Sequence, residues 1–217
     1  MNEISKVEYT DIPVNYKEIA RYAGAKTLDD GLKALIDKCL EEANNAKALK
    51  FSICYTLEDI KIEADEVDFG VFKFKSAGLA RVLAYSCKAL IFASTMGVGI
   101  DKLIRKYSAI EPSKALIFQA IGTERIESFL DYFEEQYKKE NGVDLANRFS
   151  PGFGDLSLGY QKEVFSLLKP EKNIGVTLND SLLMSPSKSV TGIIGIGKKN
   201  GNRGCASCSF INCEFRG

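Results

Sequence analysis

The residues best suited to chemistry are one arginine and two glycines in a stretch that cannot be helical, Arg148-Phe149-Ser150-Pro151-Gly152-Phe153-Gly154-Asp155. Pro151 has no amide hydrogen and biases the preceding residue toward extended backbone, while Gly152 and Gly154 tolerate positive φ. The Arg148 guanidinium can hold a carboxylate or a phosphate through two parallel hydrogen bonds. The segment therefore predicts an anion-binding turn, and the alternative is an ordinary Pro-Gly turn with a surface arginine.

An acidic helix face precedes this segment. A long periodic stretch begins at Pro112-Ser113 and stops at Asn141-Gly142, which predicts a central helix. Glu124, Glu127 and Asp131 are spaced three and four residues apart in it, so they should share one face. Such a ridge is ordinarily a solvated helix surface, and its alternative is a binding surface for a cation.

Cysteines near the C-terminal end form a second candidate site. Cys205, Cys208 and Cys213 give the spacing C-x2-C-x4-C. Three thiolates could hold an iron-sulfur cluster or zinc if a fourth ligand came from elsewhere. The alternatives are reduced thiols and a labile disulfide between Cys205 and Cys208.

Composition excludes several classes of protein. The 217 residues include 45% hydrophobic residues, 29 basic and 29 acidic residues, and no histidine. The charge balance argues against nucleic acid as a partner, and no signal-peptide core or apolar run of membrane-spanning length is present, so we expect a cytoplasmic protein. The absence of histidine excludes Ser-His-Asp and Cys-His catalysis and imidazole metal ligands.

The chain is expected to form one domain over residues 1–217, with a helical region at 1–50 and a cysteine-containing tail at 198–217. Periodicity and turn residues predict its elements. The expected helices lie at 14–22 and 28–49 and at 76–84 with Ser76 as the N-cap; the expected strands lie at 51–57, paired with 59–64, and at 71–74, 88–96 and 189–196, with a hairpin turn at Asn200-Gly201.

Further patterns follow the arginine segment in order. They are an amphipathic stretch ending in Leu167-Leu168, an Ile-Gly-x-x-Leu strand at 174–178, and a Pro-x-x-Ser-Val strand beginning at Pro186. Together with the arginine before a Pro-Gly-aromatic turn, this series resembles the activation domain of vitamin B12-dependent methionine synthase over roughly residues 120–197.

The resemblance implies an α+β fold, with helices packed on a bent antiparallel β-sheet, and a site for S-adenosylmethionine. In that site Arg148 would hold the ligand carboxylate, Glu127 would face the ammonium or sulfonium, and the turn from Ser150 through Pro151, Gly152, Phe153 and Gly154 would shape the adenosyl pocket. Phe153 lacks the hydroxyl group that a tyrosine would bring.

The resemblance also implies a role in reactivation, in which methyl transfer from S-adenosylmethionine completes the reductive methylation of cob(II)alamin. Because no histidine can serve as a lower cobalt ligand, the cobalamin is expected on a partner, a corrinoid-carrying methionine synthase or a related methyltransferase. A flavodoxin-like or ferredoxin-like protein would supply the electron. Two alternatives stay open: a cysteine-rich metal or iron-sulfur redox accessory protein, and a scaffold that only docks on a corrinoid protein.

Overall fold

A computed structural model describes residues 12–197 of the chain. Its helices are α1 (Tyr16–Tyr22), α2 (Asp30–Asn45), α3 (Ala77–Val82), α4 (Gly99–Ile110), α5 (Pro112–Asn141), α6 (Gln161–Leu168) and α7 (Pro170–Ile174), with a 3-10 turn at Leu158–Tyr160. The strands are β1 (Ser52–Asp59), β2 (Lys61–Glu63), β3 (Glu66–Asp68), β4 (Lys73–Lys75), β5 (Ser86–Thr95), β6 (Thr177–Leu178), β7 (Met184–Ser185) and β8 (Ser189–Gly197).

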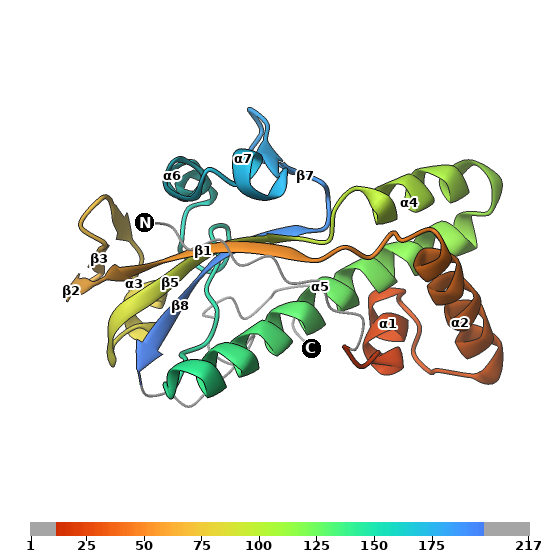
Figure 1. Cartoon of the computed structure of the whole chain (residues 1–217), viewed down its shortest axis with the longest axis horizontal. Helices are drawn as coiled ribbons and strands as arrows, with labels where there is room; N and C mark the ends of the chain where they lie inside the picture. The colour runs from red at the N-terminus through yellow and green to blue at the C-terminus, as the bar shows by residue number, and fades with distance from the viewer. Residues whose placement is uncertain (1–11, 198–217) are drawn as a thin grey trace.

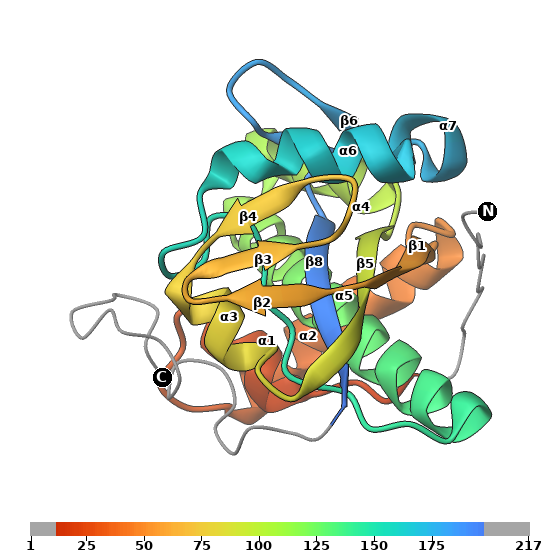
Figure 2. The same cartoon turned by 90° about the vertical axis from the view of Figure 1, so that its left-hand side faces the viewer.

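The central sheet has the strand order β1-β5-β8, and both strand pairs are antiparallel. Figure 1 shows this sheet between two helical layers, with α6 and α7 on one side and the long helix α5 on the other. Helices α1, α2 and α4 gather at one end of α5. The short strands β2, β3 and β4 form a separate antiparallel sheet near α3 (Figure 2).

Both faces of the central sheet are buried because helices pack on each of them, and the side chains of a strand alternate between the two faces. Leu90 and Phe92 of β5 join the core under α5, whereas Ala89, Ile91 and Ala93 join a second core under α3 and α6. This explains why residues 88–96 are almost continuously apolar in the sequence, as is typical of a strand covered on both sides. Strand β5 is therefore the element that the two cores share.

Several predicted boundaries are confirmed. The Ser76 hydroxyl accepts a hydrogen bond from the Leu79 amide and caps α3, and Pro112 begins α5. Gly142 ends α5 in the left-handed conformation, with φ of 64°, which glycine adopts at little cost.

Two predicted elements are wrong. Residues 59–64 do not pair with 51–57: β1 pairs with β5, and Lys61–Glu63 turns back on β3 instead. Ile174 ends helix α7 rather than starting a strand, because Pro170 supplies a good first helical residue and Gly175 a left-handed cap. Short local patterns did not reveal which partner each strand would find.

The predicted fold class, α+β with helices packed on an antiparallel sheet, is confirmed. Between residues 12 and 197 no helix combines the length and the apolar composition that a membrane crossing requires. The hairpin turn predicted at Asn200-Gly201 and the tail at 198–217 lie outside the described residues.

Candidate functional site

The segment that carries Arg148 is fixed to the outer edge of β8. The Phe149 amide donates to the Ile193 carbonyl at 2.9 Å, the Ile193 amide donates back at 2.8 Å, and the Ala146 amide donates to Gly195 at 2.8 Å. Phe149 is buried in the core under α3, so its neighbour Arg148 is directed to the other side, toward α5. Backbone pairing on β8 thus positions the guanidinium.

Three carboxylates of α5 surround that guanidinium. The Arg148 Nη1 atom lies 2.7 Å from Glu134 Oε1 and 2.9 Å from Asp131 Oδ1, and Nη2 lies 3.1 Å from Glu127 Oε2. Their spacing of four and three residues places the acids on one face of the helix. The structure therefore brings the predicted pair Arg148 and Glu127 together, in direct contact.

The members of this arginine cluster (Arg148, Glu127, Asp131 and Glu134) differ in solvent exposure. The Glu134 side chain is 13% exposed, whereas Asp131 is 69% exposed and opens to solvent. Burial raises the pKa of Glu134 against the opposing effect of Arg148. Burial lowers the pKa of Arg148, but the three carboxylates outweigh it and raise the pKa overall, so the guanidinium stays charged. Three acids around one base leave a surplus of negative charge.

The third member of the predicted acidic ridge, Glu124, is buried, unlike Glu127 and Asp131. Glu124 is 2% exposed and Arg125 is 4% exposed, and their side chains form an ion pair at 2.6 Å. Glu124 Oε1 also accepts from the Asn15 amide at 3.0 Å and from the Ser128 hydroxyl at 2.8 Å. The solvent exposure expected of such a ridge is thus wrong at Glu124, because the N-terminal segment covers that turn of α5.

The turn after Arg148 packs against Phe149 and Leu158. Gly152 and Gly154 have φ of 89° and 58°, as the sequence predicted for glycines in this turn. A Cβ atom on Gly152 would meet Leu158, and Phe153 packs edge-on against Phe149 at 5.2 Å between ring centroids. Residues 150–154 do not line the hollow described below, so their role in binding stays a prediction.

Asp155, the last residue of the segment, anchors the start of α3. Its carboxylate accepts hydrogen bonds from the Ser76 hydroxyl at 2.5 Å, from the Ala77 amide at 2.7 Å and from the Gly78 amide at 3.1 Å. Partial burial would raise the Asp155 pKa, yet these hydrogen bonds outweigh it and hold the pKa below its usual value. Asp155 therefore has a structural partner, and its carboxylate ties the turn to α3.

A hollow of about 310 Å³ lies over the arginine cluster. Its lining comes from α5, from the Arg148 segment and from the N-terminal segment with α1: Asn15, Glu18, Tyr22, Glu124, Glu127, Ser128, Asp131 and Arg148. A hollow of this size is at the small end of ligand pockets, so it suits one end of a larger ligand.

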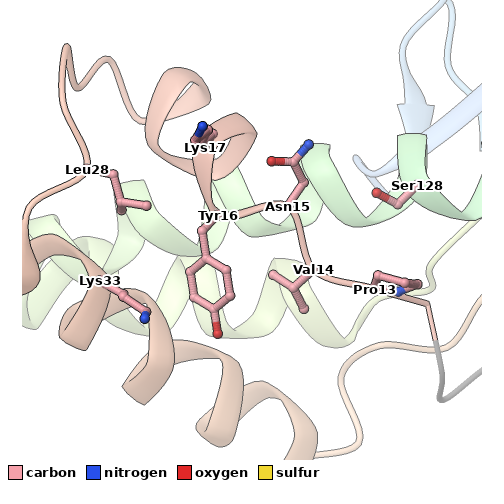
Figure 3. Close-up of a pocket in the computed structure, with 8 residues that line it drawn as sticks. All are labelled: Pro13, Val14, Asn15, Tyr16, Lys17, Leu28, Lys33 and Ser128. Atoms are coloured by element: carbon pink, nitrogen blue, oxygen red, sulfur yellow. The ribbon is translucent and has the colours of Figure 1, made fainter.

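Two larger hollows flank the N-terminal segment. One, of about 640 Å³, is drawn in Figure 3, where Tyr16 points toward α2 and Asn15 and Ser128 lie on the α5 side. The other, of about 730 Å³, lies between this segment, α2 and the start of β1. Neither contains any of the residues that the sequence predicted for the site.

The predicted metal ligands Cys205, Cys208 and Cys213 lie outside the described residues. Within residues 12–197, no three histidine, cysteine, aspartate or glutamate side chains are grouped so that they could hold a metal ion. Cys39 and Cys54 are buried, and burial raises the pKa of each thiol to about 11, which suits the packing role expected of them. Metal binding stays a prediction about the tail.

The structure is an α+β fold in which Arg148 lies beside an acidic face of α5, and the comparisons with known proteins identify its class. Residues 88–202, just over half of the chain, match the family described as the vitamin B12 dependent methionine synthase, activation domain. The chain belongs to this family.

A structural comparison gives the same fold. The chain is similar to a crystal structure of the MetH reactivation domain bound to AdoHcy, with a TM-score of 0.66, 14% sequence identity, and coverage of 92% of this chain and 80% of that chain. A comparison with curated protein sequences found no match.

Several residues around Arg148 were not predicted from the sequence. Glu134 follows Asp131 by three residues and Glu127 by seven, so continuing the helical spacing would have found it. Glu18 and Tyr22 lie more than 100 residues before Arg148, and no local pattern connects them to it.

Proposed function

We propose that this protein binds S-adenosylmethionine and presents it for reductive methylation of cob(II)alamin on a partner, a corrinoid-carrying methionine synthase or a related methyltransferase. The observation that carries the proposal is the arginine cluster: within the family-matched region, one fixed guanidinium and an excess of carboxylates face a hollow. The bound AdoHcy of the similar structure supports the same class of ligand.

The charges of the hollow fit those of the ligand. S-adenosylmethionine carries one carboxylate and two positive groups, the ammonium and the sulfonium. Arginine has five N–H groups and Arg148 uses three of them on carboxylates, so the guanidinium retains donors for a ligand carboxylate. Glu127 and Asp131, at 42% and 69% exposure, are open enough to receive the positive groups.

The contribution of the chain to the reaction would be binding and orientation. The cobalamin on the partner would accept the methyl group once a flavodoxin-like or ferredoxin-like donor had supplied one electron, and the sulfonium would leave as a neutral thioether. No proton has to move in this transfer, so the absence of histidine from the chain is no obstacle. The carboxylates around Arg148 would hold the positive end of the ligand until transfer.

Titration calorimetry with S-adenosylmethionine tests the assignment. Arg148→Ala should weaken binding about 10-fold or more, as expected for the loss of a charge-assisted hydrogen bond. Arg105→Ala is the matched control, because Arg105 is an exposed arginine of α4 outside the hollow and its loss should leave affinity unchanged. Equal affinity of the Arg148→Ala and wild-type proteins would refute the role of Arg148.

The salt dependence of ligand affinity provides a second test. Because the hollow carries surplus negative charge, wild-type affinity for S-adenosylmethionine should fall as salt rises from 50 mM to 500 mM, and S-adenosylhomocysteine, which lacks the sulfonium charge, should respond less. The same salt response for both ligands would count against the surplus charge as a source of affinity.

The cysteine motif supports a second candidate function, a metal or iron-sulfur redox accessory protein. Its ligands would be Cys205, Cys208 and Cys213. Anaerobic optical spectra with iron and zinc analysis separate the two candidates: a cluster without S-adenosylmethionine binding favours the second, and ligand binding without metal favours the first. A scaffold that only docks would show partner binding with neither.

A further inference from the structure

Helix α1 forms a wall of the hollow that holds Arg148. Asn15, Glu18 and Tyr22 line the hollow together with Glu127 and Asp131 of α5. This wall lies outside residues 88–202, the part of the chain that matches the family. Part of the lining of the hollow therefore comes from a segment that the family match does not cover.

The wall is fixed to α5 through the buried ion pair. Arg125 donates to the carbonyl of Ile12 at 2.7 Å and to that of Pro13, and Glu124 accepts from the Asn15 amide. The Asn15 side chain then caps α1 by accepting from the Glu18 amide at 3.2 Å. Figure 3 shows Asn15 of this segment and Ser128 of α5, which both line the neighbouring hollow. The first turn of α1 is thus held in register with the site.

Tyr22 is the aromatic residue among those that line this hollow. The Arg21 guanidinium lies 4.3 Å from the ring centroid and is itself bound to Glu18 at 2.6 Å, so one face of the ring is covered and its orientation is set. Partial burial raises the Tyr22 pKa and the neighbouring Glu127 raises it further, which keeps the hydroxyl protonated and the ring neutral. A neutral aromatic ring therefore borders a hollow rich in carboxylates.

An electron-rich aromatic ring attracts cations, including those without N–H donors, such as a sulfonium. A carboxylate attracts an ammonium and a sulfonium alike, whereas a ring also offers the apolar contact that a methylated sulfur prefers. We propose that Tyr22 is a specificity-determining residue of the S-adenosylmethionine site, favouring the methylated, cationic ligand over the neutral thioether that remains after methyl transfer. This inference rests on the proposed function.

The test compares the affinities for S-adenosylmethionine and S-adenosylhomocysteine, both measured by calorimetry. Tyr22→Leu should weaken S-adenosylmethionine binding about 5-fold and S-adenosylhomocysteine binding much less, while Tyr22→Phe should retain most of the preference. Tyr85→Leu is the matched control, because Tyr85 is 66% exposed and does not line the hollow. Equal losses for both ligands, or no loss for either, would overturn the role of Tyr22.

Fluorination supplies a variant series that preserves packing. Phenylalanine with an increasing number of ring fluorines at position 22 keeps the ring shape and weakens its attraction for a cation. Affinity for S-adenosylmethionine should fall stepwise along the series, and affinity for S-adenosylhomocysteine should stay level. A flat response for both ligands refutes the inference even if Tyr22→Leu does not fold. If the wild-type protein binds neither ligand, the proposed function itself fails, which is a distinct result.

Discussion

Helix α5 carries two ion-pair clusters that use the same side-chain types for different purposes. Glu124 and Arg125 are almost fully buried, and their charged groups contact each other, Ser128 of the same helix and the backbone of the N-terminal segment. The arginine cluster around Arg148, one turn further on, opens to solvent at Glu127 and Asp131. One cluster holds a segment in place, and the other faces a hollow.

The difference lies in charge balance. In the buried cluster one carboxylate meets one guanidinium, and backbone groups of the N-terminal segment complete their hydrogen bonds. In the open cluster three carboxylates meet one guanidinium, so negative groups are in excess, and two of the three carboxylates, Glu127 and Asp131, are exposed to solvent. We therefore expect charge stoichiometry and solvent exposure, rather than the proximity of opposite charges alone, to separate the structural pair from the proposed binding site.

The largest expected effect comes from breaking the buried cluster. Arg125→Met should lower the free energy of unfolding by about 3–5 kcal/mol, because it leaves the Glu124 carboxylate buried without its cation. Urea unfolding monitored by circular dichroism measures this. The control is the double variant Glu124→Gln with Arg125→Met, which should be less destabilised than Arg125→Met alone. A double variant as unstable as the single one would show that the buried charge is not the cause.

The open cluster should be less important for stability. Arg148→Met is expected to cost about 1 kcal/mol in the free energy of unfolding, because two of its three partners are well exposed and solvent screens them. The cost should shrink further in 0.5 M salt, whereas the Arg125→Met cost should not. Paired urea titrations at low and high salt make the comparison, and an Arg148 variant as unstable as the Arg125 variant would remove the distinction between the clusters.

Asp155 provides an intermediate case, a carboxylate whose partners are hydrogen-bond donors rather than an arginine. Asp155→Asn should cost about 1 kcal/mol at pH 7, in the range of a lost helix cap. Because the folded-state pKa is lowered, the stabilisation is present above the unfolded-state pKa near 4 and is lost as pH falls through the folded-state pKa. Thermal melts of both proteins between pH 3 and pH 7 should converge at the acidic end.

The smallest effect is expected at Glu134, and it has the opposite sign. Burial raises the Glu134 pKa in the folded state, so its favourable contribution is complete below the unfolded-state pKa and is lost as pH rises through the raised folded-state value. The stability of the wild type relative to Glu134→Gln should therefore decline as pH increases from 4 to 7. Thermal melts across this range check the sign, and a rising difference would show that the ion pair with Arg148 outweighs burial.

Much of the fold was predictable because its signals are local. The caps at Ser76 and Gly142 and the proline at position 112 mark helix ends, and the apolar run at 88–96 marks a strand covered on both faces. The pairing partner of each strand was harder to predict from the sequence, since pairing depends on which distant segment completes a sheet. The predicted partnership of 51–57 with 59–64 failed because β1 finds its partner about 40 residues away.

The site was predictable only in part for the same reason. Arg148 was predicted from its turn and Glu127 from helical spacing, their roles came from the resemblance, and the structure brings the two side chains into contact. Glu124 has the spacing of a ridge residue, but an N-terminal segment more than 100 residues away covers it. Tyr22 required the tertiary structure, because its approach to the hollow depends on how α1 packs against α5.

The pairing of β5 with β8 has a consequence for synthesis of the protein. It joins residues 86–95 to residues 189–197, and β8 also carries the backbone bonds that fix the Arg148 segment. On the ribosome, α5 and its carboxylates emerge well before β8, so neither the sheet nor the guanidinium position can be completed until about residue 197 is available. A nascent chain arrested before β8 should therefore expose β5, its most apolar strand, and would be the form most in need of a chaperone.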